Sequence, residues 1–162
     1  MNEALSFRWG ERRDIPMIIE FIKALAEHEK QPEAFVADPA VMEEWLFDKK
    51  AAEVLFAVED GKEIGFAVFF QNFSTFLGKG GLYLQNLYVS SSCRGKGYGK
   101  IILQKLAQIA VERGYGRMEW SCMNDNVSSV NFYLAMGAKR LDYQRDFRLT
   151  GESLQNVANG KK

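Results

Sequence analysis

Residues 94–100, with the order Arg-Gly-Lys-Gly-Tyr-Gly-Lys, concentrate side chains and glycines that suit anion binding. Glycine permits positive φ, which lets successive backbone N–H groups converge on one anion. Three basic side chains, those of Arg94, Lys96 and Lys100, add full charges that pair with phosphates. A predicted strand ends just before this segment and a predicted helix begins at Tyr98, so a helix N-terminus adds partial positive charge. The segment, which we call the glycine loop (residues 94–100), therefore predicts a pyrophosphate site.

Two common phosphate loops do not fit the spacing. A nucleoside-triphosphate loop requires Gly-Lys followed by Ser or Thr, but Ile101 follows Gly99-Lys100. The dinucleotide fingerprint requires glycine where Lys100 stands. A flexible turn with incidental glycines is a poor alternative because three basic residues gather at one helix start.

The apolar pattern that positions this loop predicts a mixed α/β fold around one sheet. Strands are predicted over Leu5–Trp9, Val54–Glu59, Ile64–Phe70, Leu82–Val89, Arg117–Cys122, Lys139–Leu141 and Asp146–Leu149. Helices are predicted from Asp14 to Gln31-Pro32, after Asp38-Pro39 with Val41, Met42, Trp45 and Leu46 inward, over Tyr98–Arg113, and from Asn126 through Leu134. Asp60-Gly61 predicts a tight hairpin, and strand–glycine loop–helix–strand predicts parallel pairing. Along Leu82–Val89 we expect Leu82, Leu84 and Tyr88 to alternate against the polar pair Gln85-Asn86.

Composition narrows the class of protein. The 162 residues suit a single domain, predicted over 1–155, with a frayed polar tail over 156–162. Lys plus Arg and Asp plus Glu are both 21, so the net charge is zero and argues against a general nucleic-acid or anionic-membrane binder. We expect a cytoplasmic protein, since the first residues lack a leader pattern and charges interrupt every apolar run.

The cysteines and the single histidine indicate no metal site. Cys93, Cys122 and one histidine do not make a zinc-ligand set or a disulfide framework. We expect both cysteines to be small buried hydrophobes. A covalent route through either thiol lacks an obvious base partner.

The glycine loop also matches the pattern Arg/Gln-x-x-Gly-x-Gly/Ala, as Arg94-x-x-Gly97-x-Gly99. Here the sequence resembles the GNAT superfamily of acetyl-coenzyme A-dependent N-acetyltransferases. Further segments resemble its diamine, or spermidine/spermine, acetyltransferase branch: Phe21–Glu29, Leu82-Tyr-Leu-x-x-Leu-Tyr-Val89, Asn126-x-x-Ser-x-Asn-Phe-Tyr133-x-x-x-Gly-Ala138 and Phe147-Arg-Leu149. The resemblance implies a mostly antiparallel sheet that splays between Leu82–Val89 and Arg117–Cys122, with helices on both faces.

The resemblance also implies how acetyl-CoA is held. The backbone N–H groups of the glycine loop are expected to bind its pyrophosphate, and the strand before the loop its pantetheine arm. The implied cofactor residues are Leu87, Tyr88, Val89, Arg94, Gly95, Lys96, Gly97, Tyr98, Gly99, Lys100, Asn126 and Tyr133. For Asn126 a plain helix cap is an equally good interpretation. Tyr133 matches the family's general acid, since a tyrosine keeps its proton at neutral pH and can donate it to a nascent thiolate.

The acceptor side departs from the relatives. The diamine branch typically carries Glu-Asp where this chain has Gln85-Asn86, and an amide neither accepts a proton nor attracts a polycation by charge. The remaining base candidates are Glu29, His28 and a water held by Gln85. Arg145 and Phe147 occupy positions where relatives tend to have an acid and an aromatic. An arginine there favours a substrate with a carboxylate beside its amine.

The sequence thus predicts an N-acetyltransferase that acts on a small primary amine (a diamine, a polyamine or a lysine-like amino acid) by direct attack in a ternary complex. Two alternatives stay open: acetylation of proteins or peptides, and a non-catalytic acyl-CoA-binding sensor. The resemblance further implies a homodimer in which residues near Arg145–Phe147 contribute to the partner's acceptor site.

Overall fold

The computed structural model describes residues 5–161. The first four residues, where we expected no leader pattern, and Lys162, the last residue of the predicted tail, lie outside the described residues. The chain divides into two compact units, Met1–Ser121 and Cys122–Lys162. None of the helices described over residues 5–161 combines the length and the apolar character that a membrane span requires.

The first unit is built on a five-stranded sheet in the order β1-β2-β3-β4-β5. Its strands are β1 (Leu5–Trp9), β2 (Glu53–Glu59), β3 (Lys62–Ser74), β4 (Lys79–Val89) and β5 (Met118–Trp120). The first four pair antiparallel, and β5 joins β4 in parallel, as the strand–helix–strand pattern predicted. The predicted tight hairpin is confirmed: Asp60 and Gly61 both have positive φ, at 50° and 76°.

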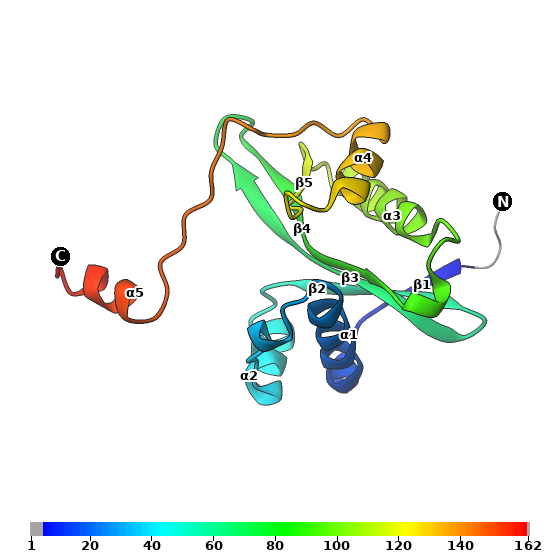
Figure 1. Ribbon diagram of the computed structural model, residues 1–162, viewed down its shortest axis with the longest axis horizontal. Coiled ribbons are helices and arrows are strands. Elements are labelled where there is room, and N and C mark those ends of the chain that lie inside the picture. Colours follow the sequence, from blue (N-terminus) through cyan, green and yellow to red (C-terminus); the bar gives the residue numbers. More distant parts are fainter. Residues whose placement is uncertain (1–4, 162) are drawn as a thin grey trace. The chain divides into compact units, whose positions relative to one another are not determined.

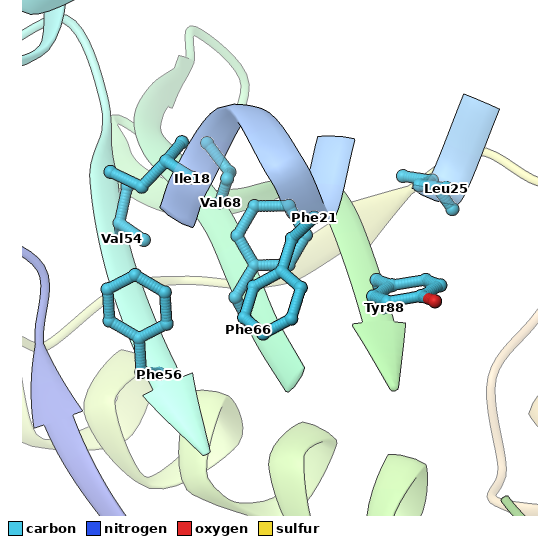
Figure 2. Close-up of a cluster of buried hydrophobic side chains, with 8 residues drawn as sticks. All are labelled: Ile18, Phe21, Leu25, Val54, Phe56, Phe66, Val68 and Tyr88. Atoms are coloured by element: carbon cyan, nitrogen blue, oxygen red, sulfur yellow. The ribbon is translucent and has the colours of Figure 1, made fainter. Parts of the chain in front are cut away.

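Helices cover both faces of this sheet, which confirms the predicted mixed α/β architecture (Figure 1). One face carries α1 (Ile15–His28), the short α2 (Pro39–Glu43) and the π-helical turn Glu44–Asp48, and the other carries α3 (Tyr98–Glu112). Short 3-10 turns lie at Arg12–Asp14, Pro32–Ala34 and Ser91–Cys93. Figure 2 shows the core between α1 and the sheet, formed by Ile18, Phe21, Leu25, Val54, Phe56, Phe66, Val68 and Tyr88.

The helix after Asp38-Pro39 only partly follows the prediction. The Asp38 side chain caps it by accepting hydrogen bonds from the N–H groups of Ala40 and Val41. Met42 and Leu46 pack against the core as expected. The inward placement of Val41 and Trp45 is wrong, since both are 51% exposed. The π-helical turn that begins at Glu44 adds a residue to the helical repeat, which rotates the side chains after it relative to an α-helix.

The second unit contains α4 (Val127–Ala135) and α5 (Gly151–Ala158). The predicted hairpin over Lys139–Leu141 and Asp146–Leu149 is wrong: residues 138–150 form neither helix nor strand. Two isolated short strands are marginal without a third strand or a helix to cover them, and Leu141, Phe147 and Leu149 are exposed. Residues 156–158 of the predicted frayed tail form the last turn of α5 instead.

Candidate functional site

The glycine loop connects the end of β4 to the start of α3. Gly95 and Gly97 have φ values of 80° and 79°, in the left-handed region that other residues avoid. A Cβ added at either position, or at Gly99, meets no atom within 4 Å, so these glycines face open space. Gly97 is the N-cap of α3, and the N–H groups of the first helical turn lack intrahelical acceptors. A helix start of this kind is suited to an anion such as a pyrophosphate, and the pyrophosphate site itself stays a prediction.

The three basic side chains of the loop have different surroundings. Arg94 donates to the Val89 carbonyl through Nε over 3.1 Å and approaches His28 Nδ1 through Nη1 at 3.0 Å. Lys96 forms an ion pair with Glu59, with Nζ 3.1 Å from Oε1. Lys100, in the first turn of α3, is exposed.

Glu59 was not identified from the sequence, although it accepts hydrogen bonds from the glycine loop. Its carboxylate receives the Tyr98 hydroxyl, Lys96 Nζ and, at 3.8 Å, the Cys93 thiol. The Tyr98 hydrogen bond and, after it, that from Lys96 hold the pKa of Glu59 below its usual value. The same carboxylate raises the pKa of Lys96 and of Tyr98. Only the sheet order brings Glu59 here: β2 and β4 run in the same direction on either side of β3, so both end at the same edge.

A β-bulge lies at Gln85 in β4. Phe69 pairs with Leu84 and Val68 with Asn86, so Gln85 is the extra residue that has no opposite partner on β3. The expected alternation is therefore wrong: Leu84 shares a face with Phe69, whereas Asn86 and Tyr88 share the α1 face with Val68 and Phe66. The Tyr88 ring packs 5.8 Å from that of Phe21 in α1.

The sheet also opens at this point. The register between β5 and β4 runs from Leu82 to Leu84 and ends where the bulge begins. β5 therefore does not follow β4 over Gln85–Val89, which includes the predicted pantetheine residues Leu87, Tyr88 and Val89. Where a neighbouring strand ends, the remaining strand exposes its main-chain donors and acceptors along that edge. The backbone along this edge is suited to pair with an extended amide-containing ligand, although the Val89 carbonyl already accepts from Arg94 Nε.

The predicted acceptor residues divide between the two units. His28 and Glu29 end α1, and Gln85 and Asn86 lie in β4, with Gln85 exposed and Asn86 partly buried. Arg145 and Phe147 belong to the second unit and are exposed, Phe147 to 95%. The structure thus places His28 against Arg94 of the glycine loop.

Asn126 and Tyr133 also lie in the second unit, at α4. The Asn126 side chain accepts from the Ser129 N–H at 3.3 Å, so it caps α4 as the alternative interpretation predicted. Tyr133 is half-buried, with its ring centroid 5.5 Å from that of Phe132. Burial, with a smaller contribution from Cys122, raises the pKa of the Tyr133 hydroxyl above its ordinary value. The group therefore stays protonated at neutral pH, which is the form that a general acid requires.

Residues 17–138 match the Acetyltransferase (GNAT) family. This chain belongs to the GNAT family of acetyltransferases. The match covers three quarters of the sequence, including the glycine loop and α4, and confirms the predicted resemblance. GNAT acetyltransferases use acetyl-CoA as cosubstrate, and the family match together with acetyltransferase relatives supports an acetyl-CoA-dependent N-acetyltransferase.

Relatives of this GNAT chain act on small amines. An L-ornithine N5-acetyltransferase from Arabidopsis thaliana is 42% identical over 93 residues, which are 57% of this chain and 41% of that protein. A thialysine N-epsilon-acetyltransferase from Bos taurus is 28% identical over 164 aligned positions, which cover 93% of this chain and 95% of that one. The chain therefore spans less than half of the plant relative and nearly all of the bovine one.

A solved structure shares the fold. An integron cassette protein from the mobile metagenome of V. cholerae superposes with a TM-score of 0.80 at 24% identity, over 97% of this chain and 99% of that chain. At that identity the likeness shows the fold alone, and it supports the mixed five-stranded sheet with helices on both faces.

Proposed function

We propose that this enzyme acetylates the terminal side-chain amine of a small amino acid, in a ternary complex with acetyl-CoA. The observation that carries the proposal is the neutral pair Gln85-Asn86 at the bulge of β4, where the diamine branch has two acids. Without those carboxylates, little at the bulge favours a polycation over an amine that carries its own carboxylate. Two relatives support this choice, since their names specify L-ornithine and thialysine, both amino acids with a terminal amine.

The cofactor side of the proposal rests on the glycine loop and β4. The backbone N–H groups from Arg94 to Lys100 would hold the pyrophosphate, and the β4 edge at Leu87, Tyr88 and Val89 would hold the pantetheine arm. Two features support these roles: the positive-φ glycines and the end of the β4–β5 register at Leu84. When bound, acetyl-CoA supplies a thioester whose carbonyl is open to attack by the amine.

The proton transfers are assigned to this chain's own residues. Tyr133 is the proposed general acid for the leaving thiolate, because burial favours its protonated form. The attacking amine must be neutral, yet at a pKa of about 10.4 only about one molecule in several thousand is free base at pH 7. Its proton passes through a water held by Gln85, or to Glu29, which is exposed at the end of α1. In the proposed homodimer, Arg145 is assigned to bind the carboxylate of the substrate held by the partner, and Phe147 to line that acceptor site.

The quaternary and cellular setting is also proposed. We infer a homodimer in the cytoplasm, in which the segment containing Arg145 and Phe147 serves the partner's acceptor site. Exposed apolar side chains in the second unit, including Phe147, Leu149, Leu154 and Val157, support an interface there. Light scattering after size exclusion should give twice the chain mass of 18.4 kDa, and a monomer would contradict the assembly.

The experiment is a thiol-release assay on matched acceptors. L-Ornithine and putrescine differ in the α-carboxylate, as do L-lysine and cadaverine, so each pair isolates that group. We expect kcat/KM to be higher for the amino acid in both pairs, by about tenfold, the value of one well-placed charged hydrogen bond. Preference for putrescine or spermidine would contradict the proposed acceptor. Reaction with peptides alone would favour a protein acetyltransferase, and acetyl-CoA binding without turnover of any amine would favour a sensor.

A further inference from the structure

The side chain of Glu59 contacts the glycine loop, although Glu59 lies in β2 and the loop follows β4. Glu59 ends β2, and its side chain is 16% exposed. Both of its oxygens lie near Lys96 Nζ, at 3.1 and 3.4 Å, and Oε1 also accepts the hydroxyl of Tyr98. Tyr98 is 4% exposed and is the first residue of α3. Two side chains of the glycine loop, those of Lys96 and Tyr98, therefore already bind a carboxylate that the protein supplies.

Glu59 and a bound phosphate would compete for Lys96. The Lys96 ammonium forms an ion pair with Glu59, so a phosphate binds Lys96 only by displacing that carboxylate. A phosphate that approaches the loop also meets the negative charge of Glu59, and like charges repel. Tyr98, in contrast, is buried, and we expect its hydrogen bond to Glu59 to persist when a phosphate binds.

We propose that Glu59 is a positioning residue that anchors α3 through Tyr98 and competes with the cofactor's diphosphate for Lys96. The proposal rests on the proposed function in one respect, namely that the diphosphate of CoA binds at the glycine loop. Glu59 thereby lowers the affinity of the loop for CoA and gives Lys96 a partner when CoA departs. Removing its charge while keeping its hydrogen-bonding oxygen separates these two roles.

The variant that does this is Glu59→Gln. The glutamine oxygen still accepts the Tyr98 hydroxyl, but the ion pair with Lys96 is lost. Calorimetric titration should show that CoA binds roughly two- to fivefold tighter, the value of one exposed ion pair. Pantetheine, which has no phosphate, should bind Glu59→Gln and the wild type equally. The matched control is Asp60→Asn, which removes a neighbouring charge, suits the positive φ of that turn position and should leave CoA affinity unchanged.

Lys96→Gln provides the second arm. In that background Glu59→Gln should give a smaller gain in CoA affinity, because the competition for Lys96 is already gone. Unchanged or weaker CoA binding by Glu59→Gln would overturn the proposal, and so would an equal gain with pantetheine. An equal gain with or without Lys96 would also overturn it.

Inorganic pyrophosphate separates this inference from the proposed function. Suppose that the wild type binds pyrophosphate but not CoA, and that the Glu59→Gln variant binds pyrophosphate more tightly than the wild type does. Then the role of Glu59 holds and the cofactor assignment fails. If CoA binds and supports turnover while Glu59→Gln changes neither ligand's affinity, the cofactor assignment holds and the inference fails. If neither anion binds, both are wrong.

Discussion

Arg94 Nη1 lies 3.0 Å from Nδ1 of His28, a contact that ties the end of α1 to the start of the glycine loop. A guanidinium only donates, so Nδ1 acts as the acceptor and the neutral ring carries its proton on Nε2. The lone pair that a general base would use is therefore committed to Arg94. This geometry favours a positioning role for His28 over the base role considered from the sequence.

His28→Asn should accordingly keep most of the turnover. The asparagine oxygen can accept from Arg94 near the position of Nδ1, so we expect kcat within about threefold of wild type and an unchanged KM for acetyl-CoA. His28→Phe, which has no acceptor, should raise that KM. A fall in kcat of about a hundredfold or more in His28→Asn, the size of a lost general base, would restore His28 as the base.

Tyr133→Phe tests the proposed general acid. Loss of the hydroxyl should lower kcat by about a hundredfold, a larger effect than the loss of CoA affinity measured by calorimetry. Tyr143→Phe is the matched control, because Tyr143 lies in the same unit and is 79% exposed. Equal kcat values for the two variants would remove Tyr133 from the mechanism.

The pH profile provides an independent check on Tyr133. Burial raises its pKa above the ordinary value of 10.0, so the protonated, active form persists to higher pH than for a free tyrosine. The alkaline fall in kcat should begin above pH 10 and should be absent from Tyr133→Phe. A fall in kcat that begins well below pH 10 and disappears in Tyr133→Phe would contradict a raised pKa for Tyr133.

Restoring the missing acids tests the acceptor assignment. Gln85→Glu and Asn86→Asp should each raise kcat/KM for spermidine relative to L-ornithine, because a carboxylate attracts a polycation and repels the amino acid's own carboxylate. We expect the larger change for Gln85→Glu, since Gln85 is exposed at the bulge and Asn86 is partly buried. Unchanged ratios in both variants would mean that neither position faces the acceptor.

Gly97→Ala and Gly99→Ala separate backbone conformation from space. Gly97 has positive φ at the N-cap of α3, so an alanine there should cost about 1 kcal/mol and weaken CoA binding roughly fivefold. Gly99 lies inside α3 without positive φ, and an added Cβ meets nothing within 4 Å. Gly99→Ala should bind CoA like the wild type. Similar losses of CoA affinity in both variants would show that these positions need glycine because a side chain blocks CoA, and not because of backbone conformation.

Asp14 supports the fold at the start of α1. Its carboxylate pairs with both Arg8 terminal nitrogens, at 2.8 and 2.9 Å, and accepts the Glu11 N–H, while Asp14 is only 7% exposed. Asp14→Asn should lower the free energy of unfolding in urea by about 2 kcal/mol. Asp142→Asn, which breaks an exposed pair with Arg140, should leave the midpoint close to wild type. A smaller loss for Asp14→Asn than for the control would contradict this.

The same pair predicts the direction of acid sensitivity. The Arg8 hydrogen bonds hold the pKa of Asp14 below its ordinary value of 3.8. The stabilisation is therefore present above pH 3.8 and is lost as the pH falls through the lower, folded-state pKa. Wild type should lose stability relative to Asp14→Asn in that acid range, and parallel curves would contradict it.

Local chemistry was readable from the sequence because it depends on neighbours along the chain. The Asp60-Gly61 turn, the helix start after Asp38-Pro39, the Asn126 cap, the end of α3 before Gly114 and the glycine loop are all set by residues within a few positions of one another. The C-terminal hairpin was mispredicted for the opposite reason. A strand needs a neighbouring edge, and no local pattern shows whether residues 139–149 have one.

The sequence by itself therefore determined the family, the position of the glycine loop and the order of the elements from β1 through α4. Only the tertiary structure decided which side chains meet at that loop. Glu59 reaches Lys96 and Tyr98 from 37 and 39 positions earlier in the chain, because β2 and β4 end at the same edge of the sheet. The bulge at Gln85 is likewise invisible in a pattern of alternating residues, since it appears only in the pairing with β3. Sheet register is a property of two strands, and a single strand's sequence does not contain it.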